Sequence, residues 1–439
     1  MYKGVPGRFF QTLSDFYWKK KWKLIRSLRR RGFDLSARIG TTVPTVGITG
    51  SVGKTTTCRM VAHILARTGR TVALATTQGT YIGAETIQTG DSAGSAYLAR
   101  LLRDRRVEAG VFEFARGGLI RDGMALTACD VGVVLNIHDN HIGQDGVGSR
   151  EDLARIKRVV VRKARRMAVL NADDPLCLAM REDVRASRTC LVSMRPDNPA
   201  VLEHRAAHGP AVVLDDSGTT PLIQVWEGRT LVAALDGSAI PATYGGSYQP
   251  SVNNALFATA AAYGLGIECT EIWDALREFS SSHETNPGRM NFFAGLPYAL
   301  LLTRASSAQV MRELALFVRG LPVEGARHLM FSMVGNRPDD YLREAARAAA
   351  GRFDSYICSD WEELRGRGPG EVAGLLAQGL LREGVPESLV TVAPTHDEAL
   401  RLAFSRARPG DLLVIISLSQ QKVWDMAERL RAAGVKTSF

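Results

Sequence analysis

The chain has 439 residues, of which 45% are hydrophobic, and its formal net charge is +10. This length predicts two or three domains with buried cores, and the positive charge fits an anionic substrate or cofactor without requiring nucleic acid. The six cysteines are scattered without a C-x-x-C pair, so neither a disulfide framework nor a zinc site is indicated. No apolar run approaches the roughly 20 residues of a membrane span, and charges interrupt the N-terminal apolar residues. We therefore expect a cytoplasmic protein without a signal peptide.

Residues 1–43 are expected to form a basic, aromatic N-terminal extension. Lysines and arginines crowd residues 18–31, which contain no acidic residue, and large apolar residues recur at helical spacing through 9–28. One interpretation is a helix that binds an anionic membrane surface or a protein partner. The other is a helix that packs on the main body and leaves its basic face in solvent. The glycine, threonines and proline at 40–44 then predict a linker.

The stretch TGSVGKTTT at Thr49–Thr57 follows a strand expected over 45–48 and opens a helix expected over 55–67. A loop of this G-x-x-G-K-T form points backbone N–H groups at phosphate oxygens, and the new helix adds its positive end. Lys54 supplies a charge for the β- and γ-phosphates, and the Thr55 hydroxyl can bind Mg²⁺. The predicted nucleotide-binding residues of this loop are Gly50, Ser51, Val52, Gly53, Lys54, Thr55 and Thr56.

From 44 to 174 the chain alternates apolar runs with helical patterns. This alternation predicts a parallel sheet with crossover helices, whose functional loops lie at the carboxyl ends of the strands. The further strands are expected over 71–76, 109–114, 131–136 and 167–171, and the further helices over 95–105 and 150–164. Polar residues stand at the ends of three of these strands, namely Thr76, Thr77, Glu113, Asn136, His138, Asp139 and His141.

Glu113 and His141 are candidate metal ligands. A carboxylate at the end of an apolar strand is costly unless it is paired or bound to a metal, and Mg²⁺ is the natural partner beside a phosphate loop. The alternative for Glu113 is a salt bridge to Arg116 or Arg121. His141 is either a metal or phosphate ligand or an ordinary loop histidine, and we interpret His138 as structural.

Residues 185–245 have short alternating runs and predict a small β-subdomain, followed by helices over 251–263 and 270–279. From 298 the alternation restarts and predicts a second doubly wound domain. Its strands are expected over 298–303, 328–334, 353–358, 389–393 and 411–416. Its helices are expected over 308–319, 340–351, 370–382, 395–407 and 420–433.

Several motifs together carry a family resemblance. They are TGSVGKTTT (49–57), TTQGTYIG (76–83), FEFARGGLIRDG (112–123), CDVGVVLNIHDNHIG (129–143), EDLARIK (151–157), VLNADDP (169–175), NNALFATAAAYGLGI (253–267), NPGRMN (286–291) and LRGRGPGE (364–371). In order and spacing the chain resembles, over 44–425, the ATP-binding core of the Mur ligases and especially the C-terminal half of cyanophycin synthetases. The resemblance implies a central ATP-binding domain at 44–295 and a Rossmann-like C-terminal domain at 296–439.

The resemblance also implies a reaction. Ligases of this family transfer the ATP γ-phosphoryl group to a carboxylate, and an amine captures the acyl phosphate to give an amide, ADP and phosphate. Such chemistry needs charge neutralisation and alignment more than a protein nucleophile. We therefore expect ATP and Mg²⁺ as cofactors and small amino-acid or peptide substrates.

Roles for single residues follow from the same resemblance. Thr55 and Glu113 would hold one Mg²⁺, and His141 would hold a second. Lys157 matches a lysine that is often carbamylated in Mur ligases, although a lysine in a basic helix is otherwise a solvated charge. Lys54 would hold the β- and γ-phosphates.

Two further residues are assigned by resemblance alone. Asn254 would face the adenine. Arg289 would clamp phosphate from the domain junction, although an arginine after Pro-Gly is otherwise a turn residue.

Several positions depart from the family pattern. Asn140 stands where an Asp usually precedes the metal-binding His, and Gln249-Pro250 replaces a His-Asn. The D-Y-A-H-N-P motif of the third domain is replaced by TRASSA at 303–308, and G-x-x-G-D-R-R by MVGNRPDD at 333–340. Either the second substrate is bound differently or ligase activity is reduced or lost.

Only the basic extension of residues 1–43 stands where Mur ligases carry a UDP-sugar domain and where cyanophycin synthetases carry an ATP-grasp half. We therefore expect neither a usual peptidoglycan-precursor ligase nor a complete cyanophycin polymerase. Three hypotheses remain open. The chain is an amide or isopeptide ligase, a catalytically weakened ATP-binding subunit of a larger complex, or another P-loop enzyme such as a small-molecule kinase.

Overall fold

The computed structural model describes residues 23–31, 39–90, 95–140, 142–305 and 307–434. Its contacts divide the chain into two compact units, Met1–Asp236 with Asn254–Leu276, and Gly237–Asn253 with Arg277–Phe439. This division differs from the expected ranges 44–295 and 296–439. One reason is that a short strand at Asn291–Phe293, before the expected boundary, pairs with the sheet of the second unit.

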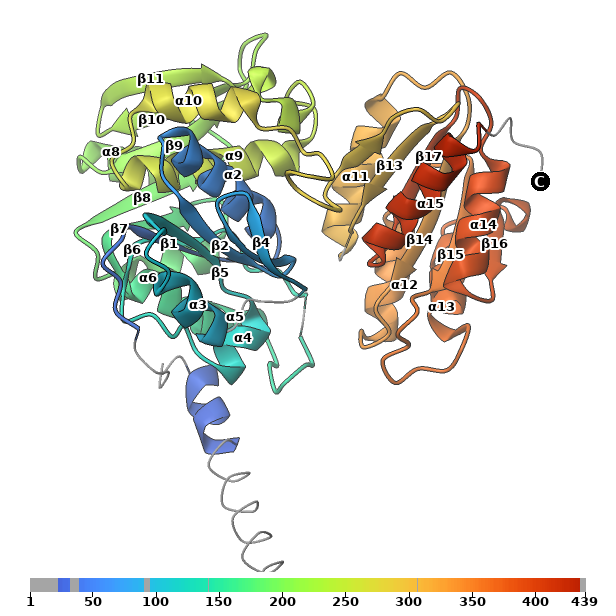
Figure 1. The fold of residues 1–439 in the computed structure, drawn as a ribbon, viewed down its shortest axis with the longest axis horizontal. Coiled ribbons are helices and arrows are strands. Elements are labelled where there is room, and N and C mark those ends of the chain that lie inside the picture. Colours follow the sequence, from blue (N-terminus) through green and yellow to red (C-terminus); the bar gives the residue numbers. More distant parts are fainter. Residues whose placement is uncertain (1–22, 32–38, 91–94, 141, 306, 435–439) are drawn as a thin grey trace, which may run out of the picture. The chain divides into compact units, whose positions relative to one another are not determined.

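The sheet of the first unit has eleven strands among the described residues, in the order β11-β10-β9-β8-β7-β6-β1-β5-β2-β3-β4 (Figure 1). From β9 to β2 every neighbouring pair is parallel, and antiparallel strands extend both edges. This confirms the expected parallel-sheet fold. The strands are β1 (Thr45–Thr49), β2 (Val72–Thr76), β3 (Gly79–Ile82), β4 (Glu85–Thr89), β5 (Ala109–Glu113), β6 (Cys129–Val134), β7 (Ala164–Asn171), β8 (Arg188–Ser193), β9 (Pro210–Asp215), β10 (Leu222–Glu227) and β11 (Thr230–Asp236).

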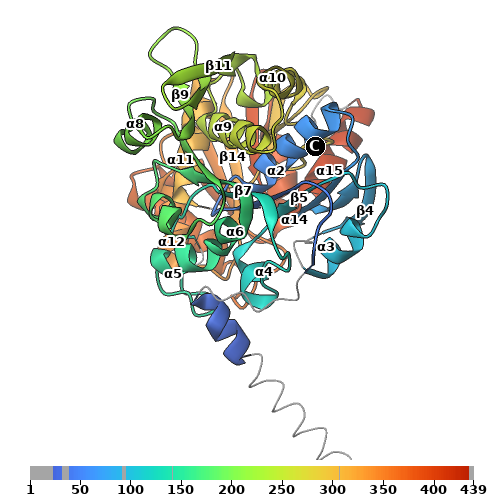
Figure 2. The ribbon, with the colours of Figure 1, turned by 90° about the vertical axis from the view of Figure 1, so that its left-hand side faces the viewer.

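Helices cover both faces of this sheet. Figures 1 and 2 show α2, α9 and α10 along one face and α3, α5 and α6 along the other. The strand order explains this layering, because the chain crosses from β1 to β2 in one direction and returns through β5, β6 and β7 in the other. The helices are α2 (Lys54–Arg67), α3 (Ser95–Leu102), α4 (Arg116–Arg121), α5 (Arg150–Lys157), α6 (Val159–Arg162), α7 (Pro175–Leu178), α8 (Pro199–Ala206), α9 (Gln249–Gly264) and α10 (Cys269–Glu278).

The structure differs from the small β-subdomain expected over 185–245. The four strands β8 to β11 continue the main sheet beyond β7. Strand β8 pairs with β7 in parallel, and α8 crosses over to β9. The middles of β8 and β9 are completely buried, as in a central parallel strand, which short apolar runs in the sequence do not distinguish from a separate sheet.

Two glycines let α6 lie close to the middle of the sheet. A Cβ at Gly132 of β6 would come within 2.5 Å of the Val160 carbonyl oxygen, and a Cβ at Gly47 of β1 within 3.4 Å of the Val160 side chain. Val160 is fully buried. The strand glycines therefore set how close α6, and the end of α5 before it, come to β1 and β6.

The second unit contains a six-stranded sheet in the order β12-β13-β17-β14-β15-β16. Apart from the antiparallel β12, the strands are parallel, which confirms the expected second doubly wound fold. The strands are β12 (Asn291–Phe293), β13 (Ala299–Thr303), β14 (Arg327–Met333), β15 (Ser355–Asp360), β16 (Val390–Ala393) and β17 (Leu412–Ile416). The helices are α11 (Ala308–Gly320), α12 (Asp339–Arg347), α13 (Glu371–Arg382), α14 (His396–Arg406) and α15 (Gln420–Ala432).

Alternate residues of these strands enter two separate cores. In β17, Leu412, Val414 and Ile416 pack with residues of α11, α12 and α13, whereas Leu413 and Ile415 pack with residues of α14 and α15. Side chains of a strand point alternately to its two faces, so near-continuous apolar strands such as LLVII bury both faces of a sheet.

Of the expected N-terminal helix, residues 23–30 are helical, and residues 1–22 lie outside the described part of the chain. The last turn contacts the first unit. Arg29 is 7% exposed and donates a hydrogen bond to the carbonyl oxygen of Arg121, whereas Leu24 is 61% exposed. The described end of the extension therefore packs on the main body. Among the described helices, none has the length and apolar composition needed to cross a bilayer.

Candidate active site

The loop that the sequence predicts to bind phosphate, called the phosphate loop below, joins β1 to α2. Close packing requires its glycines. Gly53 has a φ of 85°, and a Cβ there would lie 2.4 Å from Asn254 Oδ1. A Cβ at Gly50 would lie 2.8 Å from the Cβ of Leu135. Helix α2 begins directly after the loop at Lys54, and the first N–H groups of a helix have no acceptor within the helix. The expected strand, loop and helix are therefore present.

Asn136 organises the backbone of this loop from the end of β6. Its Oδ1 accepts hydrogen bonds from the Ser51 and Val52 amides, both at 2.9 Å, and its Nδ2 donates to the Val52 carbonyl at 3.3 Å. Two of the amides that the sequence assigned to phosphate are thus directed at a protein side chain.

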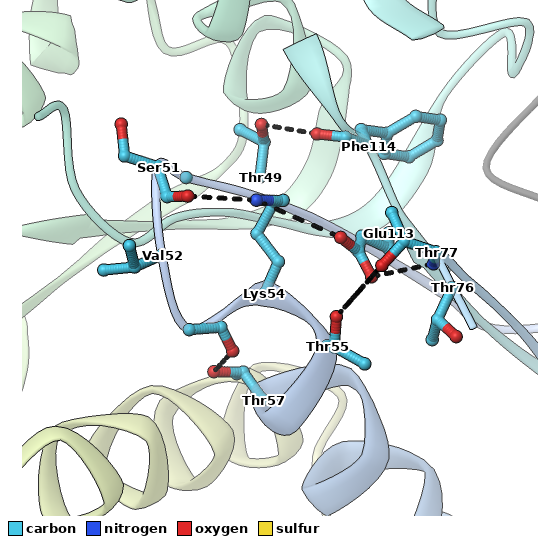
Figure 3. A network of polar contacts seen from close by, with 12 residues as sticks. Thr49, Ser51, Val52, Lys54, Thr55, Thr57, Thr76, Thr77, Glu113 and Phe114 are labelled. Atoms are coloured by element: carbon cyan, nitrogen blue, oxygen red, sulfur yellow. Dashed lines mark hydrogen bonds and ion pairs between the residues drawn. The ribbon is translucent and has the colours of Figure 1, made fainter. Parts of the chain in front are cut away.

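A buried carboxylate lies beside Lys54 and Thr55 of the loop (Figure 3). Glu113, at the end of β5, is 1% exposed, and its Oε2 accepts a hydrogen bond from Thr55 Oγ1 at 2.9 Å and from the Thr77 amide at 3.1 Å. Its Oε1 lies 4.0 Å from Lys54 Nζ, which also donates to the Ser51 carbonyl at 3.2 Å. The carboxyl ends of β1, β2 and β5 thus converge on one point.

Glu113 does not form the alternative ion pair with an arginine that the sequence left open. Arg116 Nη1 pairs instead with Asp145 Oδ2 at 2.8 Å, and the ion pair of Glu113 is with Lys54. Glu113 therefore faces the phosphate loop and its lysine, the position that a metal ligand beside a triphosphate requires.

Three oxygens around Glu113 match the ligands that Mg²⁺ prefers. Thr77 Oγ1 lies 3.4 Å from Thr55 Oγ1 and 3.5 Å from Glu113 Oε2. Hydroxyl and carboxylate oxygens suit this hard cation, which keeps several waters and binds protein through one or two carboxylates. Neither here nor at any other place in the described residues do three or more His, Cys, Asp or Glu side chains gather in a group that could hold a metal ion. The donor set fits Mg²⁺ and not a thiolate or imidazole metal.

Lys157 is a buried amine behind the loop and not a solvated charge. It ends α5, is fully buried, and donates from Nζ to the Gly50 carbonyl at 2.7 Å. Burial lowers the pKa of this amine well below its ordinary value, and the nearby charge of Lys54 lowers it further. A neutral lysine is the form that can react with an electrophile or donate to a carbonyl without a buried positive charge.

Other polar groups close the far side of the loop. The Ser51 hydroxyl accepts from the His138 amide at 2.9 Å, and Asn140 Nδ2 donates to the Ser51 carbonyl at 3.3 Å. Among the described residues, Asn140 Oδ1 and His138 Nδ1 are buried without a hydrogen-bond partner. Burial also lowers the pKa of His138. Asp174 Oδ2 accepts from the Ile137 amide at 2.6 Å and so fixes the strand end that carries these residues.

The structure brings together some of the expected site residues and not others. Lys54, Thr55, Glu113 and Lys157 gather around the loop, and Asn254 directs Oδ1 at Thr57 Oγ1, 3.3 Å away. His141 lies outside the described residues. Arg289 belongs to the second unit, where its Nη1 approaches the Gly288 carbonyl at 3.3 Å.

The segment that replaces the D-Y-A-H-N-P motif has local structural contacts. The Thr303 hydroxyl accepts from the Met290 amide at 3.3 Å, Arg304 Nη2 donates to the Leu418 carbonyl at 3.3 Å, and Ser307 caps α11 by accepting from the Val310 amide at 3.3 Å. These contacts hold the end of β13 to the neighbouring loop and begin the next helix.

Sequence reasoning gave too little weight to two residues, Asn136 and Thr77. Both were recognised as strand-end residues, but neither was given a role, although Asn136 receives two loop amides and Thr77 completes the oxygen cluster. Asp174, which fixes the strand end before His138, was missed. The sequence pattern that could have identified it is Asp-Pro at the start of a helix, which is typical of an N-cap residue.

This site and fold agree with comparisons with known proteins. Residues 48–262 match the family model of the Mur ligase middle domain. Among individual proteins, the chain is 35% identical over 394 residues to the cyanophycin synthetase of a Synechocystis species, covering 89% of this chain and 44% of that protein. The chain therefore spans less than half the length of that relative.

More distant matches agree with the same fold. The chain is 28% identical over 398 residues to the UDP-N-acetylmuramoyl-L-alanyl-D-glutamate–2,6-diaminopimelate ligase of Geobacter metallireducens, covering 85% of this chain and 73% of that enzyme. Among solved structures, the UDP-N-acetylmuramoylalanyl-D-glutamyl-2,6-diaminopimelate–D-alanyl-D-alanyl ligase of Acinetobacter baumannii has a TM-score of 0.61 at 16% identity, covering 94% of this chain and 78% of that one. Escherichia coli FolC with DHPP and ADP has a TM-score of 0.61 at 16% identity, covering 94% and 93%.

Proposed function

We propose that this chain is an ATP-dependent ligase that joins the carboxylate of an amino-acid or peptide substrate to an amine. The observation that carries the proposal is the convergence of Lys54 and Thr55 of the phosphate loop on the buried Glu113. The names of two relatives, a cyanophycin synthetase and a diaminopimelate ligase, support the reaction type. Because the chain covers only part of its cyanophycin synthetase relatives, the activity and both substrates are proposals for this chain.

In the proposed reaction, a carboxylate oxygen attacks the γ-phosphorus of ATP while the bond to the leaving ADP oxygen breaks. The amine nitrogen then attacks the acyl carbon, phosphate leaves with the former carboxylate oxygen, and the nitrogen loses a proton. Lys54 would neutralise charge on the β- and γ-phosphates as the bond to ADP breaks. The first-turn N–H groups of α2 would bind the phosphate oxygens.

The remaining residues would hold Mg²⁺ and the loop in place. Thr55, Thr77 and Glu113 would supply oxygen ligands, and bound Mg²⁺ neutralises charge on the triphosphate. His141 would complete a second metal site, and Asn254 would approach the nucleotide from α9. Lys157 would support the loop through Gly50, and its lowered pKa is compatible with carbamylation. Arg289 would bind phosphate, as the family resemblance implies.

An oxygen-18 transfer experiment tests the reaction. A candidate amino acid or dipeptide, labelled in its carboxylate, is incubated with ATP, Mg²⁺ and a pool of amines, and ADP, phosphate and amide are measured. We expect amine-dependent ADP release and one labelled oxygen in the released phosphate for each amide formed. A stable phosphorylated product would identify a kinase instead, and label-free phosphate would exclude an acyl phosphate.

The second candidate is a catalytically weakened ATP-binding subunit of a larger complex. The replaced segment at 303–308 favours it, because Thr303, Arg304 and Ser307 make local structural contacts. Nucleotide binding without turnover, for any substrate in the pool, would support this candidate over the ligase.

A further inference from the structure

A cavity of about 500 Å³ opens at the amino ends of three neighbouring strands of the first unit. Strands β6, β7 and β8 are parallel and adjacent in the sheet, so the segments that lead into them reach the same edge (Figure 1). Thr127 leads into β6, Lys163 into β7 and Arg185 into β8, and all three line the cavity. The candidate active site lies at the opposite, carboxyl ends of the strands. The cavity is therefore a separate place on the first unit.

The lining of this cavity, called the basic cavity below, is strongly cationic. Among the described residues its lining consists of four cations, a threonine and two alanines, with no acidic residue. The cations are Arg162, Lys163, Arg165 and Arg185. Like charges gathered in this way repel one another, and a bound anion would relieve that repulsion.

Two carboxylates contact the arginines from outside the lining. Asp130 Oδ1 lies 3.2 Å from Arg165 Nη2, and Asp183 Oδ1 lies 3.9 Å from Arg162 Nε. Asp183 is shared, because its Oδ2 also pairs with Arg158 Nη1 at 3.3 Å. The two acids thus hold two arginines in place, and the face that a ligand would meet remains cationic.

Backbone contacts hold the other two cations at the same edge. Lys163 Nζ donates to the Leu126 carbonyl at 2.6 Å. The amide and the hydroxyl of Ser187 both donate to the Arg165 carbonyl at 3.1 Å, which ties the segment before β8 to β7. Arg185, in that segment, is exposed and forms no hydrogen bond or ion pair with any described residue. Its guanidinium keeps all its donors for a ligand.

The lining indicates the chemistry of the ligand. Guanidinium groups bind the oxygens of phosphate or carboxylate in pairs, and an ammonium adds a point charge. The volume lies within the range of about 300–1,000 Å³ that is usual for small-molecule sites. Such sites usually carry aromatic and apolar side chains, but here the only apolar side chains are those of two alanines. A nucleoside base would therefore find no ring to stack on.

We propose that the basic cavity binds a compact polyanion with two or more phosphate or carboxylate groups. Arg162, Arg165 and Arg185 would bind its oxygens, and Lys163 would add a fourth positive charge. This inference goes beyond the proposed ligase activity and does not rest on it, because no residue of the cavity belongs to the phosphate loop or to the cluster around Glu113.

Calorimetric titration of the full-length chain with pyrophosphate, without Mg²⁺, tests the site. All proteins carry Lys54→Ala, which weakens competing binding at the phosphate loop. We expect binding that weakens as salt is added, because salt screens exposed charges. Arg185→Ala should weaken it about tenfold, because charge-assisted hydrogen bonds are lost. The matched control is Arg195→Ala, an exposed arginine beyond the carboxyl end of the same strand, β8. Equal effects of the two substitutions would overturn the proposal.

Two further ligands identify the chemistry that the cavity selects. Citrate carries carboxylates in place of phosphates, so binding of pyrophosphate, of citrate or of both supports the proposal and shows which group is preferred. If neither binds, the arginines form only a solvated face and the proposal is wrong. Adenosine, which is uncharged, should not displace pyrophosphate. Displacement by adenosine would contradict a site built for anions.

Chemical labelling of Lys163 shows whether the anion lies in the cavity. Lysines of the Lys54→Ala protein are acetylated with an N-hydroxysuccinimide ester, and the rate at each lysine is followed by peptide mass spectrometry. At a pyrophosphate concentration ten times the measured Kd, we expect Lys163 to react about tenfold more slowly, since only the ligand-free fraction reacts. Lys23, which is exposed on the N-terminal helix, should react at an unchanged rate. Pyrophosphate binding without protection of Lys163 would place the anion elsewhere and overturn the proposal.

Discussion

The two parallel sheets carry polar residues at the same ends of their strands but use them differently. In the first unit, Lys54, Thr55, Thr77 and Glu113 come from three strand ends and leave a buried carboxylate beside a lysine and two hydroxyls. Such a cluster holds the kinds of groups, oxygen donors and a cation, that bind a metal or a phosphate.

In the second unit, polar residues at the ends of β15 and β17 bind neighbouring protein groups. His396 is buried between Ser417 Oγ, 3.0 Å from Nε2, and Ser359 Oγ, 3.4 Å from Nδ1. Asp360 accepts hydrogen bonds from the Gly370 and Ala373 amides and caps α13. Position at a strand end is therefore not sufficient for a site. The first unit differs in gathering a lysine, a carboxylate and two hydroxyls from three strand ends.

The largest expected effect tests the first unit directly. Lys54→Ala should lower ADP release about 10³-fold, because it removes the cation that compensates charge developing on the phosphates. Circular dichroism and the melting temperature check that the fold is retained. Lys23→Ala, at an exposed position of the N-terminal helix, is the control. More than a tenth of the wild-type rate in Lys54→Ala would refute the assignment of the phosphate loop.

A smaller effect is expected at the neighbouring hydroxyl. Thr55→Val should lower the rate at saturating Mg²⁺ about 10²-fold, because it removes one oxygen ligand and the hydrogen bond to Glu113. Thr55→Ser keeps the oxygen and should recover most of the activity. If valine and serine behave alike in a Mg²⁺ titration, Thr55 is a packing residue and not a metal ligand.

The buried amine of Lys157 gives a pH-dependent prediction. Its pKa in the folded state is lowered relative to the unfolded chain, where it is about 10.4. Between these two pKa values the unfolded chain binds more protons than the folded chain, so the free energy of unfolding rises with pH. In Lys157→Met this dependence is lost. The difference in unfolding free energy, variant minus wild type, should therefore fall as pH rises, by at most about 1.4 kcal/mol per pH unit. Denaturant titrations at pH 7, 8 and 9 measure it. A pH-independent difference would show that Lys157 stays charged when folded.

The smallest effect is expected in the second unit. Ser307→Ala should cost about 1 kcal/mol of stability through loss of the α11 cap, with Ser307→Asp recovering it. The rate of ADP release per folded molecule should stay within about twofold, since a cap acts on the helix and not on the nucleotide. A large loss of the ADP-release rate at unchanged stability would show that Ser307 takes part in the reaction. The proposed difference between the strand ends of the two units would then be wrong.

Much of the framework could be predicted from local sequence patterns. The strand ends expected at 48, 76 and 114 from apolar periodicity lie within one residue of the observed ends at 49, 76 and 113, and the G-x-x-G-K-T form predicts the start of α2. Glu113 was recognised because a carboxylate rarely ends an apolar strand. These features depend on residues close in the chain.

Features that depend on distant pairing were not predictable in this way. The hydrogen bonds of Asn136 to Ser51 and Val52 join residues 84 and 85 positions apart, and Arg30 donates to the Asp145 carbonyl across 115 positions. An asparagine or arginine has many possible partners, and periodicity does not select among them. The strands β8 to β11 were assigned to a separate sheet for the same reason.

Gly132 shows how a residue remote from the nucleotide can affect the site. It lies in the middle of β6, where a Cβ would meet the Val160 carbonyl at 2.5 Å, and Lys157 stands three residues before Val160. Any larger residue would push this short helical segment away from the sheet. The distance from the Lys157 amine to the Gly50 carbonyl would then increase. Gly132 therefore sets the distance between this helical segment and the sheet. A harmful variant there would look like a defect of the sheet, although the part that changes would be the phosphate loop.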